Sequence, residues 1–130
     1  MATANPDFQI EGLHQVALKA TDLDASVAFY RDTLGLPLIA RFDPPGLAFF
    51  AMAGTRLMLS ANSTEATLYF SVADLAAAVV ALEAKGVAFA QKPVMIHRDE
   101  AGNFGKPGGE EWMAFLRDPS GNLLALAARR

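Results

Sequence analysis

The sequence has 130 residues, of which 52% are hydrophobic, and carries a formal net charge of −3 with no cysteine. This length suits one domain, and the apolar fraction is enough for one well-filled core. The acidic balance and the scattered lysines and arginines offer no basic face for a phosphate backbone, so we expect no nucleic-acid partner. Without cysteine the chain has neither a disulfide framework nor a thiolate metal site.

The sequence also lacks targeting and membrane signals. Residues Met1–Gln9 contain no basic n-region and no apolar h-region. No later segment approaches the run of about 18 apolar residues that a membrane span needs. We therefore expect a cytoplasmic protein with no membrane partner.

The first half of the chain predicts a strand, a helix and three further strands. A strand-like stretch from Gln15 leads to Asp22, whose side chain can accept the unpaired amide hydrogens of a first helical turn. The run Ala25–Leu34 has apolar residues at helical spacing and ends at Gly35, as a helix with a glycine cap does. Strand-like runs then follow at Leu38–Phe42, Leu47–Met52 and Arg56–Ser60.

The second half repeats this pattern. The stretch that begins at Thr67 matches the one that begins at Gln15 at an offset of 52 residues, which makes Asp74 the second helix cap. The helical run Ala76–Ala84 ends near Gly86. Further strands are predicted at Val87–Gln91, Glu111–Arg117 and Leu123–Ala127. Both halves therefore read as β-α-β-β-β.

One insertion interrupts the repeat. The segment that starts at Gly54 matches the one that starts at Gly121 at an offset of 67 residues, so the second half is longer. The extra residues lie between His97 and Gly109, where glycine, proline and charged residues occur without periodicity. We expect a mobile loop there, with Asp99 among its solvated charges.

Four segments together resemble the vicinal oxygen chelate superfamily, which includes the glyoxalase and bleomycin-resistance proteins. They are His14–Leu18, Asp22–Tyr30, Leu34–Leu36 and Arg117–Asn122. The resemblance implies an α+β fold in which two tandem β-α-β-β-β modules form a curved, cup-shaped mixed sheet around a small-molecule site. It also implies a homodimer.

The implied domain organisation is a single domain over residues 1–130. An N-terminal arm, residues 1–11, precedes module one at about 12–60 and module two at about 66–128.

In metal-using members of this superfamily, four side chains hold a divalent ion. The resemblance places the corresponding positions at Gln15, Met58, Thr67 and Ala125, and none of these is His, Glu or Asp. Thioether and methyl groups offer nothing useful to a hydrophilic cation. We therefore expect no metal and no cofactor, and a pocket lined by these four residues. His14 is adjacent to Gln15, and strand alternation turns it to the opposite face.

The insertion and its flanks hold the remaining candidates. If the loop closes over the cup, His97 comes near Glu111, whose carboxylate could orient the ring for proton transfer. Trp112 could floor a pocket for a planar ligand. The plainer interpretation makes His97 the surface end of a strand and Trp112 a core residue.

Three functions compete at this point. The first is a metal-independent protein that binds a small apolar or aromatic molecule, as a bleomycin-resistance protein does. The second is a glyoxalase-like enzyme, a lyase, epimerase or dioxygenase, or a metal-free catalyst with His97 and Glu111 as catalytic residues. The third is a structural or regulatory dimer without a ligand, because a fold shared by many activities specifies none of them.

Overall fold

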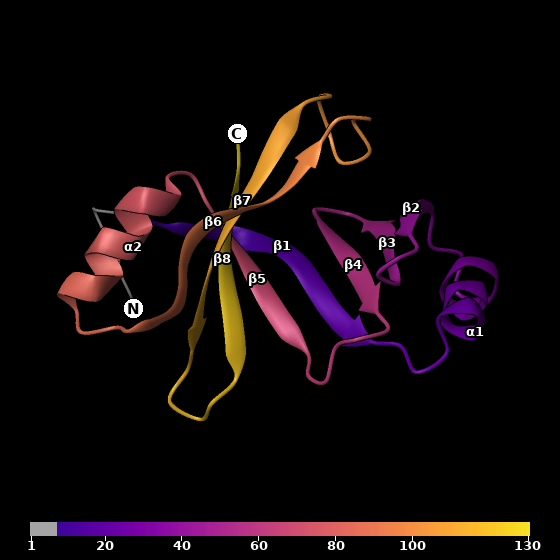
Figure 1. Cartoon of the computed structure of the whole chain (residues 1–130), viewed down its shortest axis with the longest axis horizontal. Coiled ribbons are helices and arrows are strands. Elements are labelled where there is room, and N and C mark those ends of the chain that lie inside the picture. Colours follow the sequence, from indigo (N-terminus) through magenta and orange to yellow (C-terminus); the bar gives the residue numbers. More distant parts are fainter. Residues whose placement is uncertain (1–7) are drawn as a thin grey trace. The chain divides into compact units, whose positions relative to one another are not determined.

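The computed structural model describes residues 8–130. Within them lie eight strands and two α-helices, the first of which continues into a π-helical turn, η1 (Figure 1). In chain order the elements are β1 (Ile10–Lys19), α1 (Leu23–Ala28), η1 (Phe29–Thr33), β2 (Leu38–Phe42), β3 (Leu47–Met52), β4 (Thr55–Ser60), β5 (Thr67–Val72), α2 (Leu75–Ala84), β6 (Phe89–Asp99), β7 (Gly109–Arg117) and β8 (Leu123–Arg129). No helix in this part of the chain is long and apolar enough to cross a membrane.

The chain forms two compact units. One is Leu13–Leu68, and the other is Tyr69–Arg130 together with the described residues up to Gly12. The strand order is β2-β3-β4-β1 in the first unit and β5-β8-β7-β6 in the second. Each half of the chain therefore has the predicted β-α-β-β-β order. Of the predicted N-terminal arm, residues 1–7 lie outside the described part, and Ile10 and Glu11 belong to β1.

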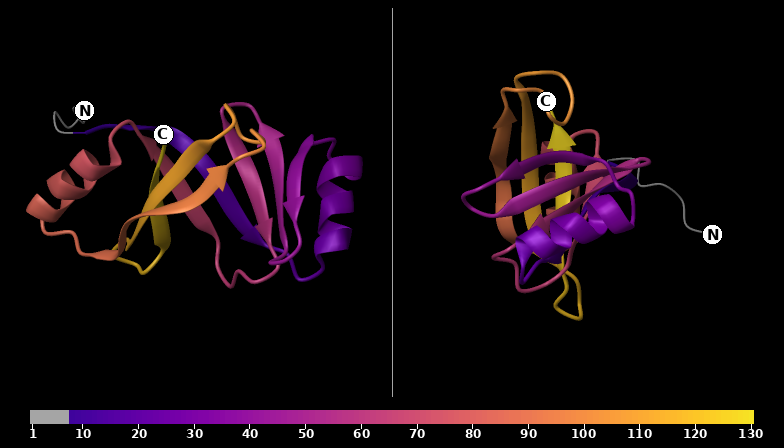
Figure 2. Two further views of the ribbon diagram at one scale, coloured as in Figure 1. Left: turned by 45° about the horizontal axis from the view of Figure 1, so that its top comes forward. Right: turned by 90° about the vertical axis from the view of Figure 1, so that its right-hand side faces the viewer.

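Each unit packs a helix on one face of its own strands, as the two views of Figure 2 show. In the first unit, α1 packs against β3 and β4 through a core around Val27, Phe50 and Leu59. In the second unit, α2 packs against β6, β7 and β8 through a core around Val79 and Leu126. Burial of this apolar surface is the main stabilising contribution within each unit.

Both helices begin where the sequence predicts. The side chain of Asp22 accepts the amide of Ala25 at 3.1 Å, and that of Asp74 accepts the amide of Ala77 at 3.0 Å. Each acidic cap satisfies an amide that the first helical turn leaves unpaired.

The end of the first helix differs from the prediction. The α-helix stops at Ala28, and the amide of Leu34 bonds to the carbonyl of Phe29 at 2.9 Å, which is the wider π-helical spacing. The wider turn accompanies packing of Tyr30 on Phe50, with ring centroids 5.9 Å apart. Apolar periodicity over so short a segment does not distinguish the two helical spacings.

The prediction of a loop between His97 and Gly109 is wrong about where the loop begins. Strand β6 runs through to Asp99, and β7 begins at Gly109, so the connection is residues 100–108. The predicted strand Val87–Gln91 accordingly begins two residues later and is much longer. Breaks in the β6 register, with Pro93 inside the strand, obscure the alternation on which the prediction relied.

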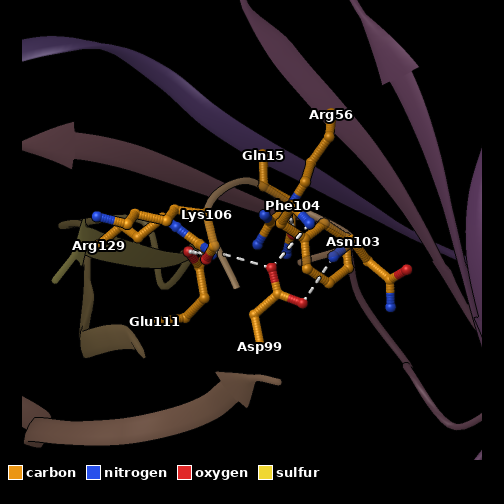
Figure 3. Close-up of polar contacts among 8 residues, drawn as sticks. All are labelled: Gln15, Arg56, Asp99, Asn103, Phe104, Lys106, Glu111 and Arg129. Carbon is orange, nitrogen blue, oxygen red and sulfur yellow. Dashed lines mark hydrogen bonds and ion pairs between the residues drawn. The ribbon is translucent and has the colours of Figure 1, made fainter. Parts of the chain in front are cut away.

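A buried carboxylate anchors this connection. Asp99 is 1% exposed, and its two oxygens accept the amides of Asn103 and Phe104, each at 2.8 Å (Figure 3). Its own carbonyl accepts the amide of Gly108 at 2.7 Å. The expectation of a solvated Asp99 is therefore wrong, because this carboxylate holds the loop that follows it.

Arg129, the last residue of β8, also binds the carboxylate of Asp99. Its Nη2 atom lies 3.0 Å from the carboxylate of Asp99 and 2.7 Å from the carbonyl oxygen of Lys106. A Cβ atom on Gly109 would displace the guanidinium of Arg129 from this position, so a glycine where β7 begins lets the arginine reach the anchor. Burial disfavours ionisation of Asp99, but the two amides and Arg129 outweigh it and hold the pKa of its carboxyl below the ordinary value.

We predict that Asp99→Asn destabilises the protein by about 2 kcal/mol, the size of a lost charge-assisted hydrogen bond. An amide can accept at only one of its two ends, so at least one loop N–H loses its acceptor, and Arg129 loses the negative charge that it pairs with. Because the folded pKa is lowered, the contribution of Asp99 is complete above about pH 4 and is lost as the pH falls through the lowered pKa. Urea unfolding of both proteins across pH 2–7 measures this.

Glu100→Gln is the matched control, because the side chain of Glu100 is 78% exposed and lies at the same hairpin. We expect it to leave the unfolding free energy nearly unchanged. A destabilisation by Asp99→Asn that stays constant down to pH 2 would contradict an ionised anchor.

Candidate functional site

The first unit presents a polar group on the sheet face that α1 does not cover. Strands β1 and β4 pair in parallel with Gln15 opposite Arg56, and strand alternation puts Met58 on the same face. The neighbours Leu57 and Leu59 point the other way, into the α1 core. His14, which precedes Gln15 on β1, is likewise on the opposite face from it.

Hydrogen bonds join these three side chains. The Oε1 atom of Gln15 accepts from Nε of Arg56 at 2.5 Å (Figure 3), and its Nε2 donates to Sδ of Met58 at 3.7 Å. Gln15 is 2% exposed, so both ends of a buried amide are used. Two of the four positions that the resemblance identified, Gln15 and Met58, are thus brought into contact.

Sequence reasoning missed Arg56. Its guanidinium carbon lies 5.5 Å from the ring centroid of Phe49, a cation–π contact, and Phe49 is the register partner of Met58 on β3. A signal was available, because Arg56 precedes Met58 by two residues and therefore shares its face.

The other two positions are apolar or neutral. Thr67 is the first residue of β5 and is 5% exposed. Ala125 lies in β8 with 0% exposure, opposite Phe115 on β7. Neither side chain adds a charge to the site.

The two residues predicted as an acid–base pair, His97 and Glu111, lie in the second unit on the sheet face that α2 does not cover. His97 on β6 and Glu111 on β7 are direct register partners, so their side chains share one side of the sheet. Glu111 is 2% exposed and lies 3.3 Å from Nη1 of Arg129. The ring of His97 contacts Phe104 edge to face, at 6.1 Å between centroids. Strand pairing brings the two residues together without any loop closure.

The structure does not bring Trp112 to this face. Trp112 follows Glu111 on β7, so it faces the opposite side, where it packs against the α2 core. Its indole N–H donates to Oε1 of Glu110 at 2.8 Å, and the guanidinium of Arg130 lies 4.6 Å from its ring centroid. Its contacts are those of a core residue, and Ala125 lies on the other face of the same strands.

The described residues contain neither a grouped set of metal ligands nor a chemically equipped hollow along α2. Within residues 8–130 no three His, Cys, Asp or Glu side chains are grouped so as to hold a metal ion. An open hollow of about 510 Å³ lies along α2 and is lined by alanines, Val80 and Asp74. Asp74 caps the helix there, so the hollow presents no group for chemistry.

These observations define a class of protein: an α+β chain of two β-α-β-β-β modules, each with one sheet face under a helix and the other presenting buried polar groups. A model of the Glyoxalase/Bleomycin resistance protein/Dioxygenase superfamily matches residues 12–126, and the chain belongs to this superfamily. The resemblance seen in the sequence is thereby confirmed. No curated protein matches the sequence.

Solved structures show the same fold. A glyoxalase/bleomycin resistance protein/dioxygenase superfamily member from Vibrio splendidus 12B01 is 14% identical, with a TM-score of 0.66 over 91% of this chain and 99% of that one. Methylmalonyl-CoA epimerase from Mycobacterium tuberculosis is 22% identical, with a TM-score of 0.63 over 98% and 91%. The Mn(II)-bound glyoxalase from Novosphingobium aromaticivorans is 18% identical, with a TM-score of 0.66 over 92% and 39%. At these identities the likeness establishes the α+β glyoxalase fold alone.

Proposed function

We propose that this protein is a metal-independent binding protein for a small organic molecule with an apolar or aromatic body. The observation that carries the proposal is the contact between Gln15 and Met58, because a buried amide and a thioether occupy positions that hold metal ligands in other superfamily members. Thr67 and Ala125 extend the proposed lining, and both are buried and uncharged.

Electrostatics supports the absence of a metal. The guanidinium of Arg56 is bonded to Gln15, so a divalent cation beside that amide would meet a fixed positive charge. The amide oxygen of Gln15, the one hard donor of the pair, already accepts from this cation. Neither the thioether of Met58 nor the methyl of Ala125 compensates for the loss of water ligands.

The same face supports binding of an apolar body. The ring of Phe49 lies opposite Met58 and packs edge to face on Phe42, with centroids 5.8 Å apart. A thioether beside an aromatic ring adapts to ligands of irregular shape.

We predict less than about 0.1 equivalent of zinc, nickel, iron or manganese per chain after purification without chelator, because no imidazole or carboxylate occupies the Gln15 and Met58 positions. Inductively coupled plasma mass spectrometry measures this. The double variant Gln15→His, Met58→Glu is the positive control, since the two side chains already touch. Close to one metal per chain in the unmodified protein, lost on Gln15→Leu, would overturn the proposal.

We also propose that the protein is a homodimer. Exposed apolar side chains support a protein interface, among them Leu34 at 54%, Val80 at 67% and Ile96 at 50%. Multi-angle light scattering at micromolar concentration is expected to give twice the chain mass of 13.8 kDa. A mass of one chain at every concentration up to about 100 µM would contradict it.

An enzyme is the second candidate, favoured by the register pairing of His97 with the buried Glu111. A histidine beside a carboxylate can move a proton, as epimerisation at a carbon next to a carbonyl requires. Several structural neighbours are methylmalonyl-CoA epimerases, from Mycobacterium tuberculosis and Streptomyces coelicolor. Methylmalonyl-CoA is therefore a reasonable first substrate to test.

If this candidate holds, the protein exchanges the α-hydrogen of methylmalonyl-CoA for deuterium in D2O, which ¹H NMR measures. We expect His97→Gln to lower the exchange rate at least about 100-fold. His14→Gln is the matched control, since His14 lies in the other unit, on the strand face opposite Gln15. Exchange no faster than in buffer would remove this candidate for methylmalonyl-CoA.

A further inference from the structure

The second helix, α2, is apolar on every side. Its one polar residue, Glu83, forms an ion pair with β6, and its inner face packs on the core of the second unit. The exposed positions of α2 are Ala76, Val80 and Ala84, which recur every four residues along one side of the helix. A surface helix of a globular protein normally carries polar side chains there, and a helix that is apolar all round is normally buried. The outer face of α2 therefore has the composition of an interface.

A hollow lies along this outer face. Val80 is in the middle of the face, with 67% of its surface exposed. The hollow has a volume of about 510 Å³, and its other apolar lining residues are Ala76, Ala77, Ala81 and Ala84. Small side chains let a second helix approach closely, to about 8 Å between the two axes. The face is therefore suited to another helix whose outer face is apolar.

Two opposite charges flank the apolar face. Asp74 caps the start of α2 and lines the hollow, and Lys85 follows the last turn. The two positions are about three turns and about 16 Å apart, so they lie on one side of the helix with Val80 near the midpoint. Within residues 8–130 neither side chain forms an ion pair. An occupant that carries the same two charges in the reverse order would pair with both.

A second copy of α2 meets these requirements. When two α2 helices pack antiparallel about a two-fold axis near Val80, Asp74 of each chain comes to Lys85 of the other. Every contact of such an isologous interface occurs twice, so one match gives two ion pairs. These pairs lie at the rim, where they fix the antiparallel orientation, and the apolar contact between them supplies most of the binding free energy.

Two other exposed apolar residues do not offer such a match. Ile96 lies on β6, the edge strand of the second unit, whose register breaks and proline disfavour pairing with a further strand. Leu34 follows the ion pair of Arg31 with Asp32, which compensates both charges on that turn. Helix α2 is therefore the better surface for a second copy.

We propose that the dimer forms through α2, whose outer face packs antiparallel against α2 of a second copy. Val80 lies at the two-fold axis, and Asp74 pairs with Lys85 of the second copy. This inference rests on the proposed homodimer and adds its surface and its orientation.

A single introduced cysteine tests the position of the axis, since the chain has no cysteine of its own. With oxidised glutathione as the oxidant, two chains of Val80→Cys form one disulfide and release two molecules of reduced glutathione. A residue at the two-fold axis lies next to its own copy, so we expect the linked dimer to form at least about tenfold faster than with Glu100→Cys, measured on non-reducing gels. Glu100 is the matched control because its side chain is 78% exposed on the β6–β7 hairpin of the same unit.

Analytical ultracentrifugation gives the dimer dissociation constant of the unmodified protein and of four variants. Val80→Glu buries an unpaired carboxylate at the centre of the contact and should leave a monomer. Lys85→Glu brings like charges together and should raise the dissociation constant at least about tenfold. Adding Asp74→Asn to Lys85→Glu should restore part of the affinity, because asparagine caps the helix without the repulsion. Leu34→Gln is the control and should leave the dissociation constant unchanged.

Each outcome separates the inference from the proposed homodimer. Weaker dimers of Val80→Glu and Lys85→Glu with the native circular dichroism spectrum, and an unaffected Leu34→Gln, support the inference. A dimer that neither substitution weakens, or cross-linking of Val80→Cys no faster than that of Glu100→Cys, overturns the inference and leaves a homodimer through another surface. A protein that is monomeric before any substitution removes the homodimer and the inference together.

Discussion

The two-residue alternation of β-strands decides which side chains of this protein are left for chemistry. In each unit one sheet face is committed to a helix, through Phe50 and Leu59 under α1 and through Leu126 under α2. Every second residue of the same strands must then point the other way. Gln15, Arg56 and Met58 are in that set in the first unit, and His97 and Glu111 in the second. The site residues therefore follow from the packing of the cores.

The same constraint explains what the sequence could and could not predict. The strands Leu38–Phe42 and Leu47–Met52 agree with β2 and β3 because their apolar runs end at clear turns. Of the two interpretations of Trp112, a pocket floor and a core residue, the first rests on its chemistry alone, and its position next to Glu111 on one strand rules out a shared face. Applying alternation around Met58 would also have found Arg56.

The prediction of a solvated loop between His97 and Gly109 failed for a different reason. Glycine, proline and charge over residues 98–109 are typical of a solvated loop, and no local pattern tells which charge will be buried. Asp99 is buried because Arg129, thirty residues later, and the amides of Asn103 and Phe104 meet it there. A long-range ion pair of this kind leaves no periodic signal in the sequence, so the anchor could be seen only in the structure.

One arginine in each unit contacts buried polar side chains on the sheet face that the helix does not cover. Arg129 contacts two buried carboxylates, Asp99 and Glu111, so its charge is compensated by the protein and its role is to hold the β6–β7 hairpin. Arg56 donates to the amide of Gln15 and its guanidinium lies beside the ring of Phe49. In each unit the arginine thus reaches its polar partner from a paired strand, Arg56 on β4 to Gln15 on β1 and Arg129 on β8 to Glu111 on β7.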